Sequence, residues 1–107
     1  MRILIALAFL GACNKADPAV DAVLSLDGDA VAGADVWPVC GGCHGADGSG
    51  GIGPAMDDEA ADNSDEQLVE IMIYGYDDMA PVGLEDQDMA DVLAYIRDTF
   101  GDYAGGE

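Results

Sequence analysis

The segment Cys40-Gly41-Gly42-Cys43-His44 constrains this chain more than any other feature of its sequence. Two cysteines separated by two residues, with a histidine directly after the second, form the pattern that attaches c-type haem. About one helical turn separates the two thiols, so both can reach the vinyl groups on one edge of a porphyrin. The histidine can then meet the iron from one face. The pattern therefore predicts a haem bound covalently through Cys40 and Cys43, with His44 as an iron ligand.

Three other interpretations of this motif are weaker. A redox-active dithiol is expected within a βαβ frame, and no strand-like alternation surrounds the motif. A structural zinc site needs four ligands, but the chain has only three cysteines and one histidine, without a second pair. A disulfide across a two-residue gap closes so short a loop that it would stabilise the fold little. Haem attachment is the preferred interpretation.

The N-terminus has the pattern of an export signal. Arg2 gives a positive start, and the apolar run over residues 3–10 is too short to span a bilayer. The Leu-Gly-Ala-Cys sequence that ends at Cys13 resembles the lipobox of bacterial lipoproteins. This resemblance implies that residues 1–12 are a signal peptide and that Cys13 becomes a lipid-modified N-terminus. An ordinary signal peptide with an incidental cysteine, or an uncleaved anchor, are the alternatives.

The rest of the chain divides into three parts. Residues 13–26 contain Pro18, alanines and scattered aspartates without a convincing apolar face, which predicts a lipid-anchored flexible tether. Residues 27–101 form the predicted haem domain. Residues 102–107 follow a terminating glycine and are expected to be a flexible tail.

The chain is strongly acidic. Three basic residues face 22 acidic ones, for a formal net charge of -19, and this sign excludes nucleic acid as a partner. The charge favours either steering toward a basic redox partner or a heavily solvated acidic surface. Both interpretations stay open, because the acids are spread along the chain.

Helical signals occur in three segments, at about 28–39, 64–75 and 86–100. The second segment starts with a capping box in which Ser64 is the cap and Gln67 is the reciprocal residue. No segment has the alternation of a strand. The expected fold is all-α, with three or more helices wrapped around one covalent haem.

With the haem motif at the end of its first helix, the chain resembles the class I cytochromes c over about residues 27–100. In that family, the N-terminal and C-terminal helices cross at a glycine and aromatic residues, and Gly33, Trp37 and Tyr95 match these positions. The resemblance implies the cytochrome c fold and one covalent haem c. We expect Trp37 and Tyr95 to be scaffold residues.

The resemblance also implies the environment of the iron. Gly53-Pro54 matches the family's Gly-Pro, whose proline carbonyl accepts a hydrogen bond from the ligand histidine. Met79 lies in a segment like the family's Met-Pro loop, although an alanine separates it from the proline. Met79 is therefore the expected sixth ligand, with Met56 second. Pro54 is expected to orient His44.

These features predict a single-electron carrier at the periplasmic side of a bacterial membrane, with redox proteins as partners and the membrane reached through a lipid anchor. The chain is expected to be a monomer or a subunit of a complex, and no self-contained catalytic motif is evident. Two alternatives stay open: a haem-based gas sensor, and a haem subunit of a larger respiratory complex.

Overall fold

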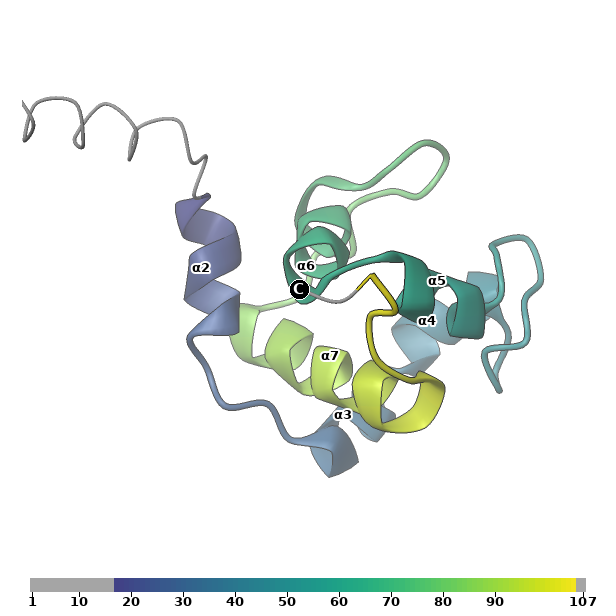
Figure 1. Ribbon diagram of the computed structural model, residues 1–107, viewed down its shortest axis with the longest axis horizontal. Helices are drawn as coiled ribbons and strands as arrows, with labels where there is room; N and C mark the ends of the chain where they lie inside the picture. The colour runs from purple at the N-terminus through teal and green to yellow at the C-terminus, as the bar shows by residue number, and fades with distance from the viewer. Residues whose placement is uncertain (1–16, 106–107) are drawn as a thin grey trace, which may run out of the picture.

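The computed structural model describes residues 17–105, and these residues fold into helices joined by loops (Figure 1). The signal peptide predicted over residues 1–12 and the lipidation site Cys13 lie outside this range. Tyr76 and Met79 pair in an isolated backbone bridge, and no strand forms within residues 17–105. The all-α prediction is confirmed. The helices are α2 (Pro18–Leu24), α3 (Ala30–Val36), α4 (Pro38–His44), α5 (Met56–Asp62), α6 (Asp65–Tyr74) and α7 (Asp86–Phe100).

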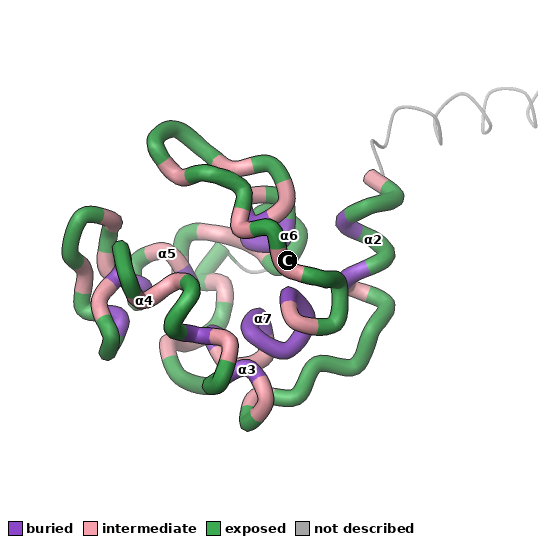
Figure 2. Tube along the Cα trace, turned by 180° about the vertical axis from the view of Figure 1, so that it is seen from behind, coloured by how far each residue is buried: buried purple, intermediate pink, exposed green. Residues whose placement is uncertain are grey.

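Helix α7 lies at the centre of the molecule, and Figure 2 shows its middle as buried. Its buried stripe includes Met89, Val92 and Ile96. Helix α3 crosses α7 at Gly33, where a Cβ atom would collide with the carbonyl of Asp91. The two helix backbones can approach this closely only because the crossing residue has no side chain.

The helix predicted over 28–39 is two helices, so the prediction of one continuous segment is wrong. Asp29 caps α3 by accepting a hydrogen bond from the Val31 N–H at 2.9 Å, which delays the start to residue 30. Pro38 has no N–H for a continuing helix and instead occupies the first turn of α4. Trp37 joins the two helices, and α4 then runs on to His44.

The flexible tether predicted over 13–26 is wrong for residues 18–24, which form α2. Asp17 caps the helix through the Ala19 N–H at 2.9 Å, and Pro18 occupies its first turn. Val20 and Val23 are buried against the rest of the fold. Their i, i+3 spacing is the apolar face that sequence analysis did not recognise.

Two further features were not predicted. Helix α5 begins at Met56, buries Met56 and Ala60, and has three acidic residues in its first turn, which favours a helix N-terminus. In the tail expected to be flexible, the Ala104 N–H donates to the Ala61 carbonyl at 2.9 Å, which fixes this residue to α5. Among residues 17–105, no helix combines the length and apolar character needed to cross a bilayer.

Candidate haem site

Helix α4 positions all three residues of the attachment motif. Cys40 is half-buried, Cys43 is exposed, and His44 is buried with 9% of its surface accessible. Both cysteines are free thiols. Burial raises the pKa of the Cys40 thiol, because the thiolate would lose its hydration. The single short helix thus presents one thiol to the interior and one to the surface.

The imidazole of His44 is held in one orientation. Its Nδ1 lies 2.8 Å from the Pro54 carbonyl oxygen. Because a carbonyl can only accept, Nδ1 carries the proton and Nε2 is left with its lone pair free for a metal. This is the contact that the Gly53-Pro54 match predicts. A Cβ on Gly53 would lie 3.0 Å from the imidazole ring, so glycine lets the backbone pass against it.

The motif opens into a cavity whose walls are almost entirely apolar. Cys40, His44 and Met79 meet there, although they come from α4 and from the loop after α6. Glu59 is the one ionisable residue of the wall besides the cysteine and the histidine. The lining residues are Trp37, Cys40, His44, Met56, Glu59, Leu68, Ile71, Met72, Met79 and Ile96.

Met79 is carried by a tight, hydrogen-bonded turn. The Tyr76 N–H donates to the Met79 carbonyl at 2.9 Å, and the Met79 N–H donates back to Tyr76 at 2.8 Å. Within this turn Asp77 adopts a φ of 54°, the left-handed backbone region that tight turns use, and Gly75 directly before it has a φ of 81°. The turn gives the half-buried Met79 a defined position at the cavity.

The other methionines are placed differently. Met56, the second candidate ligand, is buried in the cavity wall on the first turn of α5. Met72 belongs to the core and to the wall, whereas Met89 lies in the core without lining the cavity. The geometry therefore brings Met56, Met72 and Met79 to the site and leaves Met89 as packing.

These residues fit a haem c. Two thiols one helical turn apart can form thioethers, an oriented imidazole can supply nitrogen, and a thioether sulfur can supply the opposite ligand. The apolar walls suit a porphyrin face. Within residues 17–105, every buried side-chain nitrogen and oxygen has a hydrogen-bond partner. A porphyrin in the cavity would therefore cover no unpaired polar side-chain group of these residues.

Trp37 and its neighbours support the site from the α3–α7 crossing. The Trp37 indole N–H donates to the Ala46 carbonyl at 2.9 Å, which ties the loop after the motif to the core. Its ring lies 5.7 Å from that of Tyr95 and 5.3 Å from that of Phe100, at tilted angles. Such pairs fill the crossing and fix its geometry. Phe100 is a member of this cluster that sequence analysis did not identify.

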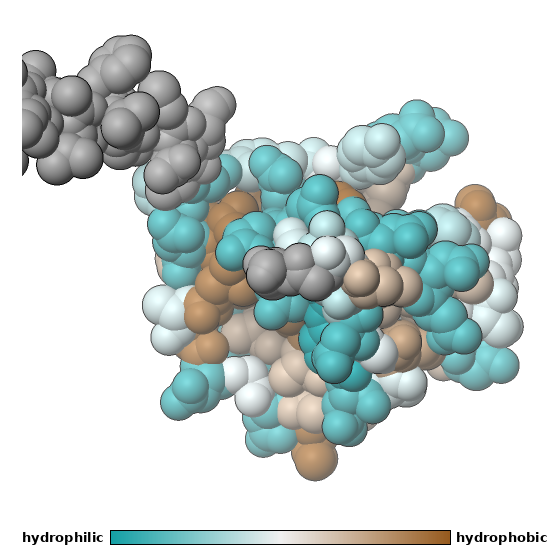
Figure 3. All heavy atoms as spheres, in the orientation of Figure 1, coloured by the Kyte–Doolittle hydropathy of each residue, from teal (hydrophilic) through white to brown (hydrophobic). Residues whose placement is uncertain are grey.

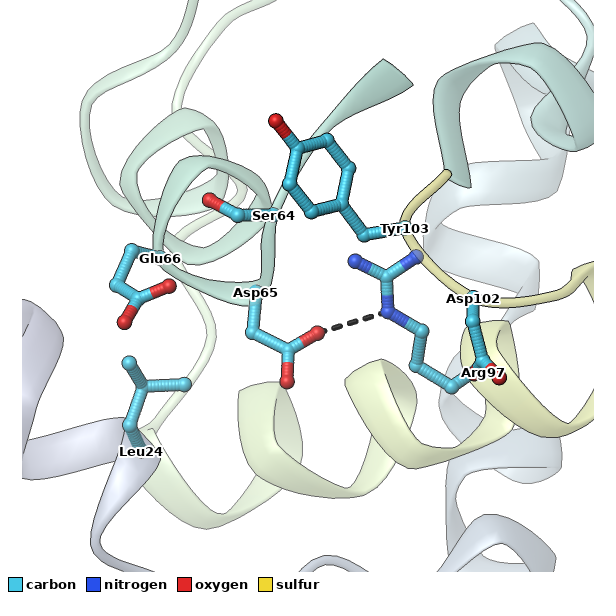
Figure 4. Close-up of a pocket in the computed structure, with 7 residues that line it drawn as sticks. All are labelled: Leu24, Ser64, Asp65, Glu66, Arg97, Asp102 and Tyr103. Carbon is cyan, nitrogen blue, oxygen red and sulfur yellow. Dashed lines mark hydrogen bonds and ion pairs between the residues drawn. The ribbon is translucent and has the colours of Figure 1, made fainter. Parts of the chain in front are cut away.

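A second hollow has a different character (Figure 4). It is open and polar, and Arg97 in its wall forms an ion pair with Asp65 at 2.7 Å. The Arg97 guanidinium also donates to the carbonyls of Ala60, Asn63 and Gly101. Four of its five N–H groups are thus engaged, and the arrangement joins α5, α6 and α7. The hollow is a structural junction.

Comparison with known proteins identifies the family. No curated protein and no solved structure matches the chain. The family described as "Cytochrome C oxidase, cbb3-type, subunit III" matches residues 27–96, which are 70 of the 107 residues. This match covers the haem motif, the cavity and the Met79 turn. The chain therefore belongs to this family and is a c-type cytochrome of all-α cytochrome c fold, whose haem chemistry is electron transfer.

Proposed function

We propose that this protein is a single-electron carrier with one haem c, attached covalently through Cys40 and Cys43. His44 and Met79 are the axial ligands of the iron. The observation that carries this proposal is the convergence of Cys40, His44 and Met79 on one apolar cavity, although the turn that bears Met79 lies 35 residues beyond His44. When bound, haem supplies an iron that gains or loses one electron at a time.

The residues of the chain adapt the site to electron transfer. Pro54 holds the imidazole of His44 in one orientation. The neutral thioether of Met79 favours the reduced state relative to a second imidazole. The apolar walls exclude water, which keeps reorganisation small. Because His44 and Met79 would both hold the iron, the carrier is favoured over a gas sensor.

The family description supports a second candidate: a haem subunit of a larger oxidase. The chain would then pass electrons within a permanent assembly rather than by brief encounters. Gentle detergent extraction distinguishes the two, because a subunit leaves the membrane in a stoichiometric complex and a carrier leaves it alone.

Lipid anchoring at Cys13 completes the proposal and places the protein at the outer face of a bacterial membrane. Its support is the lipobox-like sequence, together with the need to attach c-type haem outside the cytoplasm. Redox proteins at that face are the proposed partners. Cys13→Ser should release the protein from the membrane fraction without changing its haem spectrum, and membrane retention of the variant would contradict the anchor.

The ligand set is tested by absorption spectra of the oxidised and reduced haem protein. Met79→Ala should abolish the sulfur-to-iron charge-transfer band and allow the reduced protein to bind carbon monoxide rapidly. Met56→Ala is the matched control, because it removes a thioether from the same cavity, and its band should persist. Loss of the band in Met56→Ala instead would reverse the assignment. Rapid carbon monoxide binding by the unaltered protein would favour the gas sensor.

A further inference from the structure

Helix α2 is an addition to the domain that the family defines. Residues 18–24 precede the matched segment, which begins at residue 27. The helix nevertheless packs against α6 and α7, with Val23 fully buried and Val20 at 4% exposure. In Figure 3 hydrophobic residues gather beside α2 on an otherwise largely hydrophilic face. A segment that served only as a spacer would need none of this packing.

The helix on which α2 packs also carries both ends of the Met79 turn. Helix α6 ends at Tyr74, and Gly75 leads directly into the turn over residues 76–79. After the turn, the chain comes back to α6, where the Val82 N–H donates to the Met72 carbonyl at 2.9 Å. The position of Met79 therefore depends on the position of the C-terminal half of α6.

A side-chain contact joins α2 to that end of α6. The Tyr74 hydroxyl donates to Asp17 Oδ2 at 2.9 Å, while Asp17 Oδ1 caps α2. The Tyr74 hydrogen bond is the main cause that lowers the pKa of Asp17, and the same bond raises the pKa of Tyr74. The contact thus connects Asp17, the N-cap residue of α2, with Tyr74, the last residue of α6.

We propose that α2 is a brace that positions the Met79 turn. Because α2 packs on α6 and its N-cap Asp17 accepts a hydrogen bond from Tyr74, it raises the free energy needed to move the turn away from the iron. Val23 and Tyr74 are positioning residues in this account. The inference rests on the proposed ligation by Met79 and adds to it a role for a helix outside the family segment.

Imidazole is a suitable probe, because it binds ferric haem only when the sulfur ligand leaves. The experiment uses the full haem-loaded chain. Val23→Asp places a carboxylate in the buried α2 contact, and it should raise the affinity for imidazole about tenfold. Ala22→Asp adds the same charge at the exposed neighbouring position and should leave the affinity unchanged. Equal affinities in the two variants would overturn the brace.

A milder pair of variants tests the proposal if the Val23→Asp chain does not fold and incorporate haem. Tyr74→Phe removes only the hydroxyl that contacts Asp17, and it should raise imidazole affinity about twofold to threefold and weaken the sulfur-to-iron band at equilibrium with imidazole. Tyr76→Phe removes the same group from an exposed ring in the turn itself. If Tyr74→Phe behaves as Tyr76→Phe does, α2 does not position the turn.

Met79→Ala separates this proposal from the one on which it rests. Made alone, Met79→Ala should raise the affinity for imidazole more than any α2 variant does, because it removes the sulfur ligand that competes with imidazole. No effect of Met79→Ala would overturn the ligand assignment and the brace with it. A large effect of Met79→Ala, combined with unchanged affinity in Val23→Asp and Tyr74→Phe, would overturn the brace alone.

Discussion

Gly33 lies where the backbones of α3 and α7 come closest, with the Asp91 carbonyl and Tyr95 Cβ against it. Replacing a helical glycine with alanine ordinarily stabilises a helix by about 1 kcal/mol. At this crossing the added methyl group collides with backbone, which cannot yield as a flexible side chain would. The collision outweighs the gain in helix propensity, so the substitution should destabilise the protein.

Gly33→Ala should therefore lower the free energy of unfolding of the haem protein by about 3 kcal/mol, measured by guanidinium denaturation. Ala34→Ser, on the exposed side of the same helix, should change it by less than about 0.5 kcal/mol. A Gly33→Ala protein as stable as its parent would show that the two helices do not cross as described.

At the scale of single residues, motif and resemblance pointed to residues that the fold brings together. Cys40, His44 and Met79 line one cavity, and the hydrogen bond from His44 to Pro54 is present. Other contributions were not predictable, since they depend on which elements meet in space. Asp91 is an example, because its carboxylate accepts the Asp29 N–H at 2.9 Å from 62 residues away.

Among the elements, Arg97 is the principal connection between the ends of three helices. Its side chain is 15% exposed, and it hydrogen-bonds to carbonyls at the ends of α5 and α7 as well as to Asp65 at the start of α6 (Figure 4). A planar guanidinium has five N–H donors, more than any other side chain, so it can satisfy several acceptors at once.

Arg97→Met keeps the apolar stem and removes these donors, and it should lower the free energy of unfolding by about 2–3 kcal/mol, because carbonyls lose their partners. Asp65→Asn removes only the charge of a carboxylate that is 51% exposed, and it should cost less than about 1 kcal/mol. Equal costs in thermal or denaturant unfolding would indicate that the ion pair, and not the carbonyl contacts, holds the junction.

The helices at 65–74 and 86–100 were predicted almost to the residue, because the first starts at the Ser64 capping box and the second has a clear apolar stripe that ends before Gly101. Helices α2 and α5 were missed since each has only seven residues, too few for a periodic pattern to stand out. Their local signals were the Asp17-Pro18 start of α2 and the acidic first turn of α5. The break at Trp37 was visible only as a proline late in a presumed helix.

Over the whole molecule, electrostatic repulsion opposes folding. Within residues 17–105, Arg97 is the one basic residue among 21 acidic ones, and much of the face in Figure 3 is hydrophilic. Since nearly all of these charges have the same sign, their mutual repulsion destabilises the compact state. At 1 M salt the Debye length is about 3 Å, so the repulsion between exposed charges farther apart than this is largely screened.

The thermal midpoint of the haem protein should therefore rise by several degrees between low salt and 1 M sodium chloride at neutral pH. The increase should shrink near pH 4, where carboxylates take up protons and the repulsion falls. A midpoint that falls with salt would mean that attractive ion pairs dominate. The association rate with a redox partner, measured over the same salt range, tests steering separately.

The ordered α2 also changes the proposed membrane arrangement. If Cys13 carries the lipid, four Cα–Cα steps separate it from Asp17, a span of at most about 14 Å. The domain would then stay close to the bilayer surface instead of sweeping freely above it, as a tether up to residue 26 would have allowed. A carrier held in this way would exchange electrons with partners at the same membrane.

Every role proposed here depends on one haem joined to the chain through two cysteines of the helix that ends at its only histidine. Intact-protein mass spectrometry is the decisive test, on protein made by a bacterial host competent in cytochrome c maturation. We expect the mass of the mature polypeptide plus one haem, retained after denaturation, and loss of this covalent haem in the Cys40→Ser, Cys43→Ser double variant. A denatured parent protein with the mass of the polypeptide alone would contradict it.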